Sequence, residues 1–296
     1  MKSISYIERA SGESKTENVP GEGMLKWLYS SVSGKLALHL LIKRKFISTL
    51  GGWYMDNRLS AQRIQKFVTQ HNINLNECQI SDPAQYKTFN DFFCRKLKDG
   101  MRPLGKNVVS PADGKILLFQ SLEDIISFFV KGSEFTLDSF LRNEKLSTKF
   151  EDGAMAIIRL APADYHRYHF PASGFASESV KIKGHYYSVS PLALKDSLKI
   201  FRENKREYCT LQTKEYGDIL IIDVGATMVG SIIQTYKANS EVKKGDEKGY
   251  FAFGGSTLVL LFEKNKIKFD TDLIENTRKG LETSIRMGEN IASSVY

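Results

Sequence analysis

The sequence GYFAFGGSTLVLLFEK, residues 249–264, places two glycines and two hydroxyl residues directly before an apolar run. The run, residues 258–262, is typical of a buried β-strand, because a short apolar segment next to turn residues suits a strand inside a core. The glycines allow another backbone or a ligand to approach closely, and Ser256 offers a hydroxyl nucleophile at the strand edge. On these residues alone a Gly-Gly-Ser-Thr turn is favoured, and the G-x-S-x-G pattern of α/β-hydrolases is missing.

Short apolar runs of the same kind continue over most of the chain after residue 101. Turn signals such as Asp113-Gly114 separate them, as expected between β-strands. The predicted strands include KILLF, SFFVKGSEFTL, AMAIIRLAP, DILIIDVGA, MVGSIIQTY and STLVLLFEK. Residues 52–100 instead have helical periodicity in SAQRIQKFVTQHNI and TFNDFFCRKL. This order predicts an α+β fold, with a helical N-terminal region followed by a β-rich core of barrel-like or sandwich form.

The composition excludes several classes of protein. The 296 residues are 42% hydrophobic and 26% charged, as in an ordinary globular protein of one large domain or two small ones. The three cysteines are far apart, so neither a disulfide framework nor a zinc site is predicted, and a reducing compartment fits best. Apolar windows of about 18 residues are missing, and the polar N-terminus has no apolar signal-peptide core, so neither a membrane span nor export by that route is expected.

The charge is biased toward basic residues. Lys and Arg number 42 against 34 Asp and Glu, a net charge of +8, which favours polyanions or anionic membranes without identifying either. Residues 1–23 are polar and predict a loose lead-in. Residues 24–50 hold five bases and no acid, with apolar residues at helical spacing. From this pattern alone, a helix packed on its own domain is favoured over a helix in the membrane interface, where Trp27 and Tyr29 would suit the headgroup region.

Two further clusters carry side chains suited to catalysis. Asp113 precedes Gly114 in a common hairpin signal, so a turn role is favoured for Asp113 taken alone. His166 and His169 lie three residues apart in APADYHRYHFPASG, without the Cys or acidic cluster of a metal site, so acid–base or orienting roles rank above metal binding. Asp113, His169 and Ser256 permit a triad in which His activates Ser, although spacing alone does not establish one.

Five motifs follow one another in a recognisable order. They are FNDFFCRKLKDGMRPL, SPADGKI, YHRYHFP, YYSVSP and FGGST. In this order they resemble the phosphatidylserine decarboxylase family, from about residue 50 to the C-terminus. Any one motif would be weak evidence, whereas five in order make a chance match implausible.

Members of this family make their own cofactor, and the resemblance implies the same here. The family's G-S-T motif matches Gly255, Ser256 and Thr257, which implies self-cleavage between Gly255 and Ser256. Ser256 would then become a covalent pyruvoyl group (pyruvate) on a small α chain, residues 256–296, beside a large β chain, residues 1–255. Glycine permits the strained backbone in which Ser256 attacks the preceding carbonyl. By the same resemblance, His169 is the base and Asp113 orients it.

The resemblance further implies an enzyme that converts phosphatidylserine to phosphatidylethanolamine. The pyruvoyl carbonyl would condense with the substrate amine as a Schiff base and accept the electrons released with carbon dioxide. His166 is the candidate acid that returns a proton to the α-carbon. Tyr165 and Ser188 are candidate substrate-binding residues, and Ser190 stands where the family more often has Asn.

An enzyme acting on a diacyl lipid must reach the bilayer, so the resemblance favours a membrane-surface role for residues 24–50. It implies a membrane-associating helical region, residues 24–100, and a catalytic domain, residues 101–296. We expect a peripheral protein on the inner face of the cell membrane, assembled from its own β and α chains, with a dimer of these pairs also allowed. Neither a metal nor a nucleic-acid partner is expected.

Two other interpretations remain open. A Ser-His-Asp hydrolase acting on a lipid or peptide would use the same three residues without cleaving its own chain. A non-catalytic membrane-surface binding protein would need none of them. The size of the purified chain and its sensitivity to phenylhydrazine distinguish these from a self-processing decarboxylase.

Overall fold

The computed structural model describes residues 5–17, 51–121, 124–125, 136–184, 203–225, 231–254 and 256–295. Its strands are β1 (Ser5–Glu8), β2 (Ser14–Thr16), β3 (Val108–Val109), β4 (Gly114–Phe119), β5 (Ala154–Leu160), β6 (Arg167–His169), β7 (Gly174–Ala176), β8 (Val180–Ile182), β9 (Arg206–Gln212), β10 (Asp218–Gly225), β11 (Ile232–Gln234), β12 (Ser240–Val242), β13 (Glu247–Phe251), β14 (Ser256–Phe262), β15 (Ile267–Phe269), β16 (Glu282–Ile285) and β17 (Asn290–Ser294). Its helices are η2 (Arg58–Arg63), α4 (Ile64–His71), η3 (Leu75–Glu77), η4 (Pro83–Gln85), α5 (Phe89–Phe93), α7 (Leu137–Leu141), α8 (Glu144–Lys149) and α11 (Thr271–Arg278). A helical region followed by a β-rich core confirms the predicted α+β fold.

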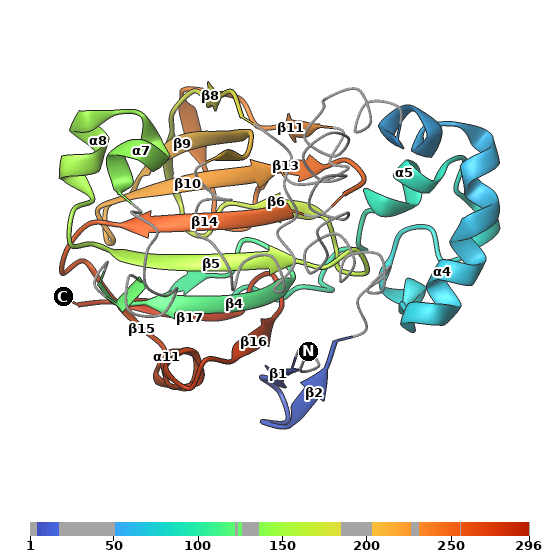
Figure 1. Cartoon of the computed structure of the whole chain (residues 1–296), viewed down its shortest axis with the longest axis horizontal. Helices are drawn as coiled ribbons and strands as arrows, with labels where there is room; N and C mark the ends of the chain where they lie inside the picture. The colour runs from blue at the N-terminus through green and yellow to red at the C-terminus, as the bar shows by residue number, and fades with distance from the viewer. Residues whose placement is uncertain are drawn as a thin grey trace, which may run out of the picture.

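A sheet of eleven strands runs through the centre of the molecule (Figure 1). Ten strands follow the order β12-β7-β9-β10-β14-β5-β4-β16-β1-β2, and β8 pairs with β9. Strand β14 lies in the middle, antiparallel to β10 on one side and to β5 on the other. All seven of its residues are buried, which explains why its sequence reads as a continuous apolar run.

Apolar clusters cover both faces of this sheet. On one face, Leu258 and Leu260 of β14 pack with residues of two three-stranded sheets, β11-β13-β6 and β15-β17-β3. On the other face, Val259 and Leu261 pack in a cluster that includes Phe140 of α7. Successive residues of a strand point to opposite faces, so Ser256 lies on the same face as Leu258 and Leu260. The hydroxyl of Ser256 therefore belongs to the interior between the large sheet and the small ones.

A helical unit, residues 51–100, lies beside the end of the sheet at which β14 begins (Figure 1). Its helices enclose a third apolar cluster that contains Phe89 and Phe93. Phe253, in the segment that precedes β14, packs against this cluster with its ring centroid 5.2 Å from that of Phe89 and 5.1 Å from that of Phe93. The helical unit therefore contacts the chain just ahead of Ser256.

Two local predictions need correction. The loose lead-in predicted for residues 1–23 is wrong for residues 5–17, where β1 and β2 form a hairpin and β1 pairs in parallel with β16. The edge of β16 supplies backbone hydrogen-bond partners to β1, and the polar sequence of this segment gives no indication of that pairing. The helix predicted from TFNDFFCRKL is also shorter than the stretch over which the helical periodicity continues. Helix α5 ends at Phe93, and Leu97 pairs with Cys78 in an isolated β-bridge instead.

Other predictions concern stretches that the structure does not describe. The basic amphipathic helix of residues 24–50 lies outside the described residues, as does most of the predicted strand SFFVKGSEFTL. Within the described ranges, none of the helices combines the length and apolar character needed to cross a bilayer.

Candidate active site

Ser256 is the first residue of β14 and is fully buried. The backbone register places it opposite Gly225 of β10 and Leu160 of β5. Its Oγ is buried without a hydrogen-bond partner among the described residues. Burying a hydroxyl in this way costs about 1–3 kcal/mol, so an unpartnered serine in the central strand of a sheet indicates a functional demand on the position.

His169 ends β6 and is only 8% exposed. Its Nδ1 lies 2.9 Å from the carbonyl oxygen of Gly245, which can only accept, so Nδ1 carries the proton and donates. Nε2 then accepts a hydrogen bond of 3.2 Å from the hydroxyl of Tyr165. Burial lowers the pKa of His169, so the ring is neutral at pH 7. A neutral imidazole with a basic Nε2 has the chemistry of a general base.

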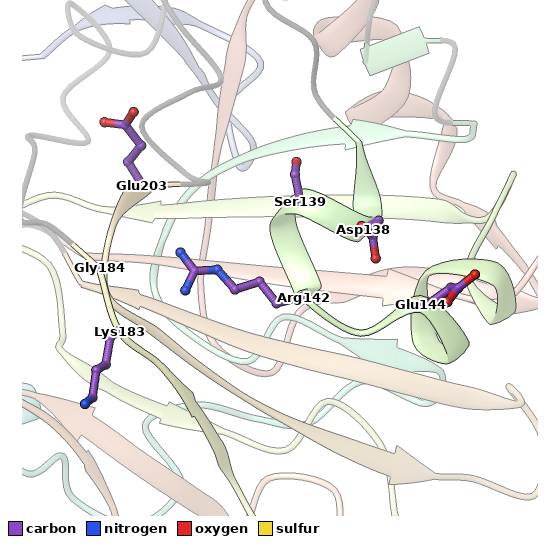
Figure 2. Close-up of a pocket in the computed structure, with 7 residues that line it drawn as sticks. All are labelled: Asp138, Ser139, Arg142, Glu144, Lys183, Gly184 and Glu203. Carbon is purple, nitrogen blue, oxygen red and sulfur yellow. The ribbon is translucent and has the colours of Figure 1, made fainter.

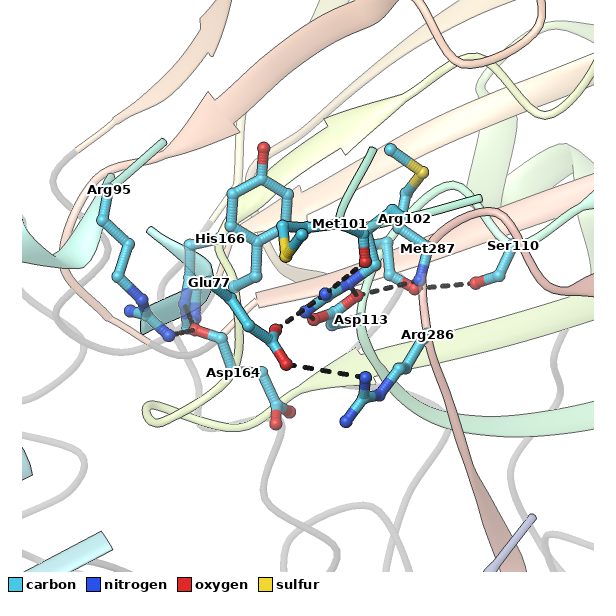
Figure 3. A network of polar contacts seen from close by, with 12 residues as sticks. Glu77, Arg95, Met101, Arg102, Ser110, Asp113, Asp164, His166, Arg286 and Met287 are labelled. Atoms are coloured by element: carbon cyan, nitrogen blue, oxygen red, sulfur yellow. Dashed lines mark hydrogen bonds and ion pairs between the residues drawn. The ribbon is translucent and has the colours of Figure 1, made fainter. Parts of the chain in front are cut away.

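Asp113 is held by an arginine rather than by a histidine (Figure 3). Nε and Nη2 of Arg102 donate to its two carboxylate oxygens over 3.0 and 2.6 Å. The backbone N–H of Met287 donates to Oδ1 over 2.8 Å, and Nη1 of Arg102 donates to Glu77 over 2.8 Å. Burial opposes the charge on Arg102, yet the two carboxylates raise its pKa. The bidentate geometry fixes the Asp113 carboxylate firmly.

His166 is a second buried and neutral imidazole. Its Nδ1 donates to the carbonyl oxygen of Asp164 over 2.9 Å, and its ring lies on Phe93 with centroids 3.8 Å apart. Burial lowers the pKa of His166 to about 3. Its Nε2 is buried and has no hydrogen-bond partner among the described residues. His166 therefore presents a lone pair, rather than a proton, to the interior.

The structure brings some of the predicted site residues together and keeps others apart. Tyr165 and His169 are in direct contact, and the negative charge of Asp113 lies near enough to raise the pKa of His169, against the larger effect of burial. Among the described residues, His169 has no hydrogen bond to Asp113 or to Ser256. The predicted triad of Asp113, His169 and Ser256 is therefore not connected by hydrogen bonds in this structure. Two predicted residues lie outside the described part of the chain: Ser188 and Gly255.

Two polar residues near the site were missed by the sequence analysis. Arg102 binds Asp113, and Asn90 of α5 accepts a hydrogen bond of 2.9 Å from the backbone N–H of Phe253. Both lie in FNDFFCRKLKDGMRPL, the first of the five motifs that carry the family resemblance. Asn90 stands out there as an amide among the phenylalanines, whereas Arg102 is one of several basic residues and carries no such signal.

A pocket elsewhere in the described residues gives no alternative candidate for the active site, and neither does any metal-binding group there. Figure 2 shows a pocket of about 820 Å³ beside α7, lined by residues of both charges. Helices α7 and α8 lie at the end of the sheet opposite to the start of β14 (Figure 1), and the predicted site residues that the structure describes do not line the pocket. The described residues also contain no group of three or more His, Cys, Asp or Glu placed to hold a metal ion.

Comparison with known proteins gives one consistent match. The family model for phosphatidylserine decarboxylase matches residues 89–293. A phosphatidylserine decarboxylase proenzyme of Fusobacterium nucleatum subsp. nucleatum is 54% identical across 99% of this chain and 98% of its own. Proenzymes of the same name from Clostridium novyi (strain NT) and Clostridium botulinum (strain Kyoto / Type A2) are 48% and 44% identical, across 94% and 98% of this chain and 95% and 99% of their own. The matched region includes Asp113, both site histidines and Ser256.

Proposed function

This chain belongs to the phosphatidylserine decarboxylase family, and on that premise we propose that it converts phosphatidylserine to phosphatidylethanolamine with a pyruvoyl group made from its own Ser256. The observation that carries the proposal is the buried Oγ of Ser256, at the first position of the central strand β14, which has no hydrogen-bond partner in the described part of the chain. A serine kept there for structure alone would leave its hydroxyl unsatisfied. A serine that must act as a nucleophile and then be replaced by a carbonyl fits the position.

The group would form by self-cleavage between Gly255 and Ser256. Oγ of Ser256 attacks the carbonyl carbon of Gly255, a C–O bond forms, the amide C–N bond breaks, and the hydroxyl proton ends on the released amine. β-Elimination then removes the α-proton of residue 256 and breaks its Cβ–Oγ bond, so that Oγ leaves within the new carboxylate of Gly255 and a dehydroalanine remains at position 256. Addition of water and loss of ammonia convert the dehydroalanine to the pyruvoyl group. Two chains result, residues 1–255 and 256–296.

The base in this cleavage is His169, oriented by its surroundings. Its neutral ring and its Nδ1–H bond to the Gly245 carbonyl leave Nε2 as the atom that takes the proton from Ser256. To do so, Nε2 must exchange the hydroxyl of Tyr165 for that of Ser256. The charges of Glu247 and of Asp113, the latter held in place by Arg102, stabilise the imidazolium that forms. General-base assistance of this kind contributes roughly 10²–10⁴ in rate.

In the decarboxylation, a pyruvoyl carbonyl supplies an electron sink for the electron pair released as carbon dioxide leaves. The α-carbon of the product then needs a proton, and His166 delivers it from Nε2. Because burial lowers the pKa of His166 to about 3, this atom carries a proton only when the negative charge of the substrate stabilises the imidazolium. Contacts from Tyr165 and Ser188 to the headgroup complete the proposed site.

The lipid substrate requires a surface that meets the bilayer, and residues 24–100 provide it in this proposal. Two large apolar side chains of the helical unit support this role: Trp53 is 68% exposed and Leu59 is 64% exposed. The net charge of +8 favours attachment to anionic leaflets. We place the enzyme at the inner face of the cell membrane as a peripheral protein, and the β and α chains stay together as its working unit.

Intact mass measurement of the purified protein tests the cleavage and the cofactor together. The expected C-terminal fragment begins at position 256 and is lighter by one ammonia than the peptide that would begin with serine. Ser256→Ala should give a single chain of 33.5 kDa without decarboxylase activity. Phenylhydrazine should inactivate the native enzyme by trapping its carbonyl, whereas a Ser-His-Asp hydrolase would keep its activity. A wild-type chain that stays whole, with a free Ser256, would contradict the proposal.

A further inference from the structure

Helix α5 and its C-cap residue Cys94 hold the segment that leads to the cleavage site by two polar contacts. Oδ1 of Asn90 accepts a hydrogen bond of 2.9 Å from the backbone N–H of Phe253. One turn further along, the thiol of Cys94 lies 3.4 Å from the carbonyl oxygen of Phe251. Burial raises the pKa of Cys94 to about 12, so the thiol is protonated and donates. Residues four apart share one face of a helix, which lets both contacts form at once.

Asn90 is itself fixed on its other side. Its Nδ2 donates to the carboxylate of Asp56 over 2.7 Å, so the amide cannot rotate without losing one bond or the other. This orientation keeps Oδ1 aimed at Phe253. The ring of Phe253 is clamped in addition between Phe89 and Phe93, at centroid distances of 5.2 and 5.1 Å.

Ser256 lies only three positions after Phe253, a span of about 10 Å at most. Ser256 is fixed by its pairing with β10 and β5, and Phe253 is fixed by α5. Gly254, between them, has a φ of +146°, a value that residues with a side chain rarely adopt. The described residues on both sides of the scissile bond are therefore held by different parts of the fold, the sheet on one side and the helical unit on the other.

We propose that Asn90 is a positioning residue for self-cleavage, which fixes the chain ahead of the scissile bond so that the Gly255 carbonyl meets Ser256. This inference rests on the proposed function. Asn90 has no hydrogen bond to the Oγ of Ser256 in the described part of the chain, and in this proposal it acts through the backbone of Phe253. Attack by a hydroxyl on a carbonyl is sensitive to geometry, and a misplacement of about 1 Å can cost roughly a hundredfold in rate.

The test follows the cleavage rate of newly made full-length chain in a cell-free translation pulse, resolved on denaturing gels. Asn90→Leu has a similar size but no acceptor, and it should slow cleavage roughly ten- to a hundredfold. Asn90→Asp combined with Asp56→Asn keeps an acceptor for Phe253 and a donor on the opposite side, and should cleave near the wild-type rate. Asn74→Ala removes a helix cap in the same unit, away from the segment, and should also cleave normally.

The outcomes separate this inference from the proposed function. If wild-type chain cleaves and Asn90→Leu cleaves as fast, Asn90 does not position the segment. If the Asn90→Asp, Asp56→Asn pair is as slow as Asn90→Leu, the acceptor oxygen is not what matters, and the inference is again overturned. If Asn74→Ala is as slow as Asn90→Leu, the effect is general loss of the helical unit. A wild-type chain that never cleaves would overturn the proposed function and this inference with it.

Discussion

Tyr165 and His169 are joined by a hydrogen bond of 3.2 Å in which the tyrosine hydroxyl donates to Nε2 of the imidazole. The direction of the bond follows from the other side of the ring, where Nδ1 donates to the carbonyl oxygen of Gly245. The two contacts hold His169 as one neutral tautomer. The Tyr165 contact occupies the nitrogen that the proposed cleavage needs, so in that proposal this bond must break before His169 takes the proton from Ser256.

The pH dependence of self-cleavage should report this arrangement. Burial lowers the pKa of His169, so its basic form persists below pH 6.5, and the cleavage rate should stay flat from neutral pH to below that value before it falls. A bond from Tyr165 to Nε2 stabilises the neutral ring, so Tyr165→Phe should move the acid limb to higher pH. Pulse-labelled precursor incubated across pH gives both profiles. His169→Ala, the control, should lose roughly 10²–10⁴ in rate, and an unmoved limb in Tyr165→Phe would contradict the assignment.

The contribution of the Arg102–Asp113 pair to stability should be large. The side chain of Arg102 is 8% exposed, so its removal leaves the Asp113 carboxylate largely buried without its partner. Arg102→Ala should lower the free energy of unfolding by about 3–5 kcal/mol. Urea unfolding in a Ser256→Ala background, which prevents cleavage, measures this. Arg286→Ala is the matched control, because Arg286 is 63% exposed and lies 3.7 Å from Glu77, and should cost less than about 1 kcal/mol. Equal losses of unfolding free energy in Arg102→Ala and Arg286→Ala would show that Arg102 does not act as a buried ion-pair partner of Asp113.

The sequence predicted the strand that carries Ser256 well and the neighbourhood of Ser256 poorly. An apolar run such as residues 258–262 has few alternatives to a buried strand, and β14 is observed there. Asp113 was seen as a turn residue or as the partner of His169. In the structure its carboxylate accepts hydrogen bonds from Arg102, eleven residues earlier, and nothing in local periodicity encodes a contact that forms only when two loops meet.

The shortened helix α5 illustrates the same limit. Periodicity in TFNDFFCRKL continues past Phe93, yet Arg95 turns away and donates to the carbonyl oxygens of Ala163 and Asp164. These tertiary contacts, with the pairing of Cys78 and Leu97, are worth more than the extra helical turn. The sequence likewise could not predict that the Oγ of Ser256 lacks a partner among the residues that the structure describes, since a missing hydrogen bond is a property of the packed interior.

Acid should destabilise the precursor through His166. Its pKa is lowered to about 3 in the folded chain, against an ordinary value of about 6.5, so the unfolded chain binds more protons between these values. The stabilising effect is complete above pH 6.5 and is lost as the pH falls toward 3. Between pH 7 and pH 5, Ser256→Ala precursor should lose about 2 kcal/mol more than the same precursor carrying His166→Asn. Parallel urea titrations at the two pH values measure the difference, and equal losses would show that His166 is not a buried neutral ring.

Cleavage should leave the two chains bound to each other. The small chain begins with β14, whose residues hydrogen-bond to β10 and β5 of the large chain on both sides. Five apolar side chains of β14 are buried, residues 258–262, and each is worth roughly 1.5–3 kcal/mol. Ion pairs such as Arg159 with Glu282 add little by comparison. Gel filtration should therefore show the two fragments eluting together in dilute buffer and in 1 M salt, and separating only in denaturant. Release of the small chain by salt alone would mean that ion pairs, rather than the strand, hold it in place.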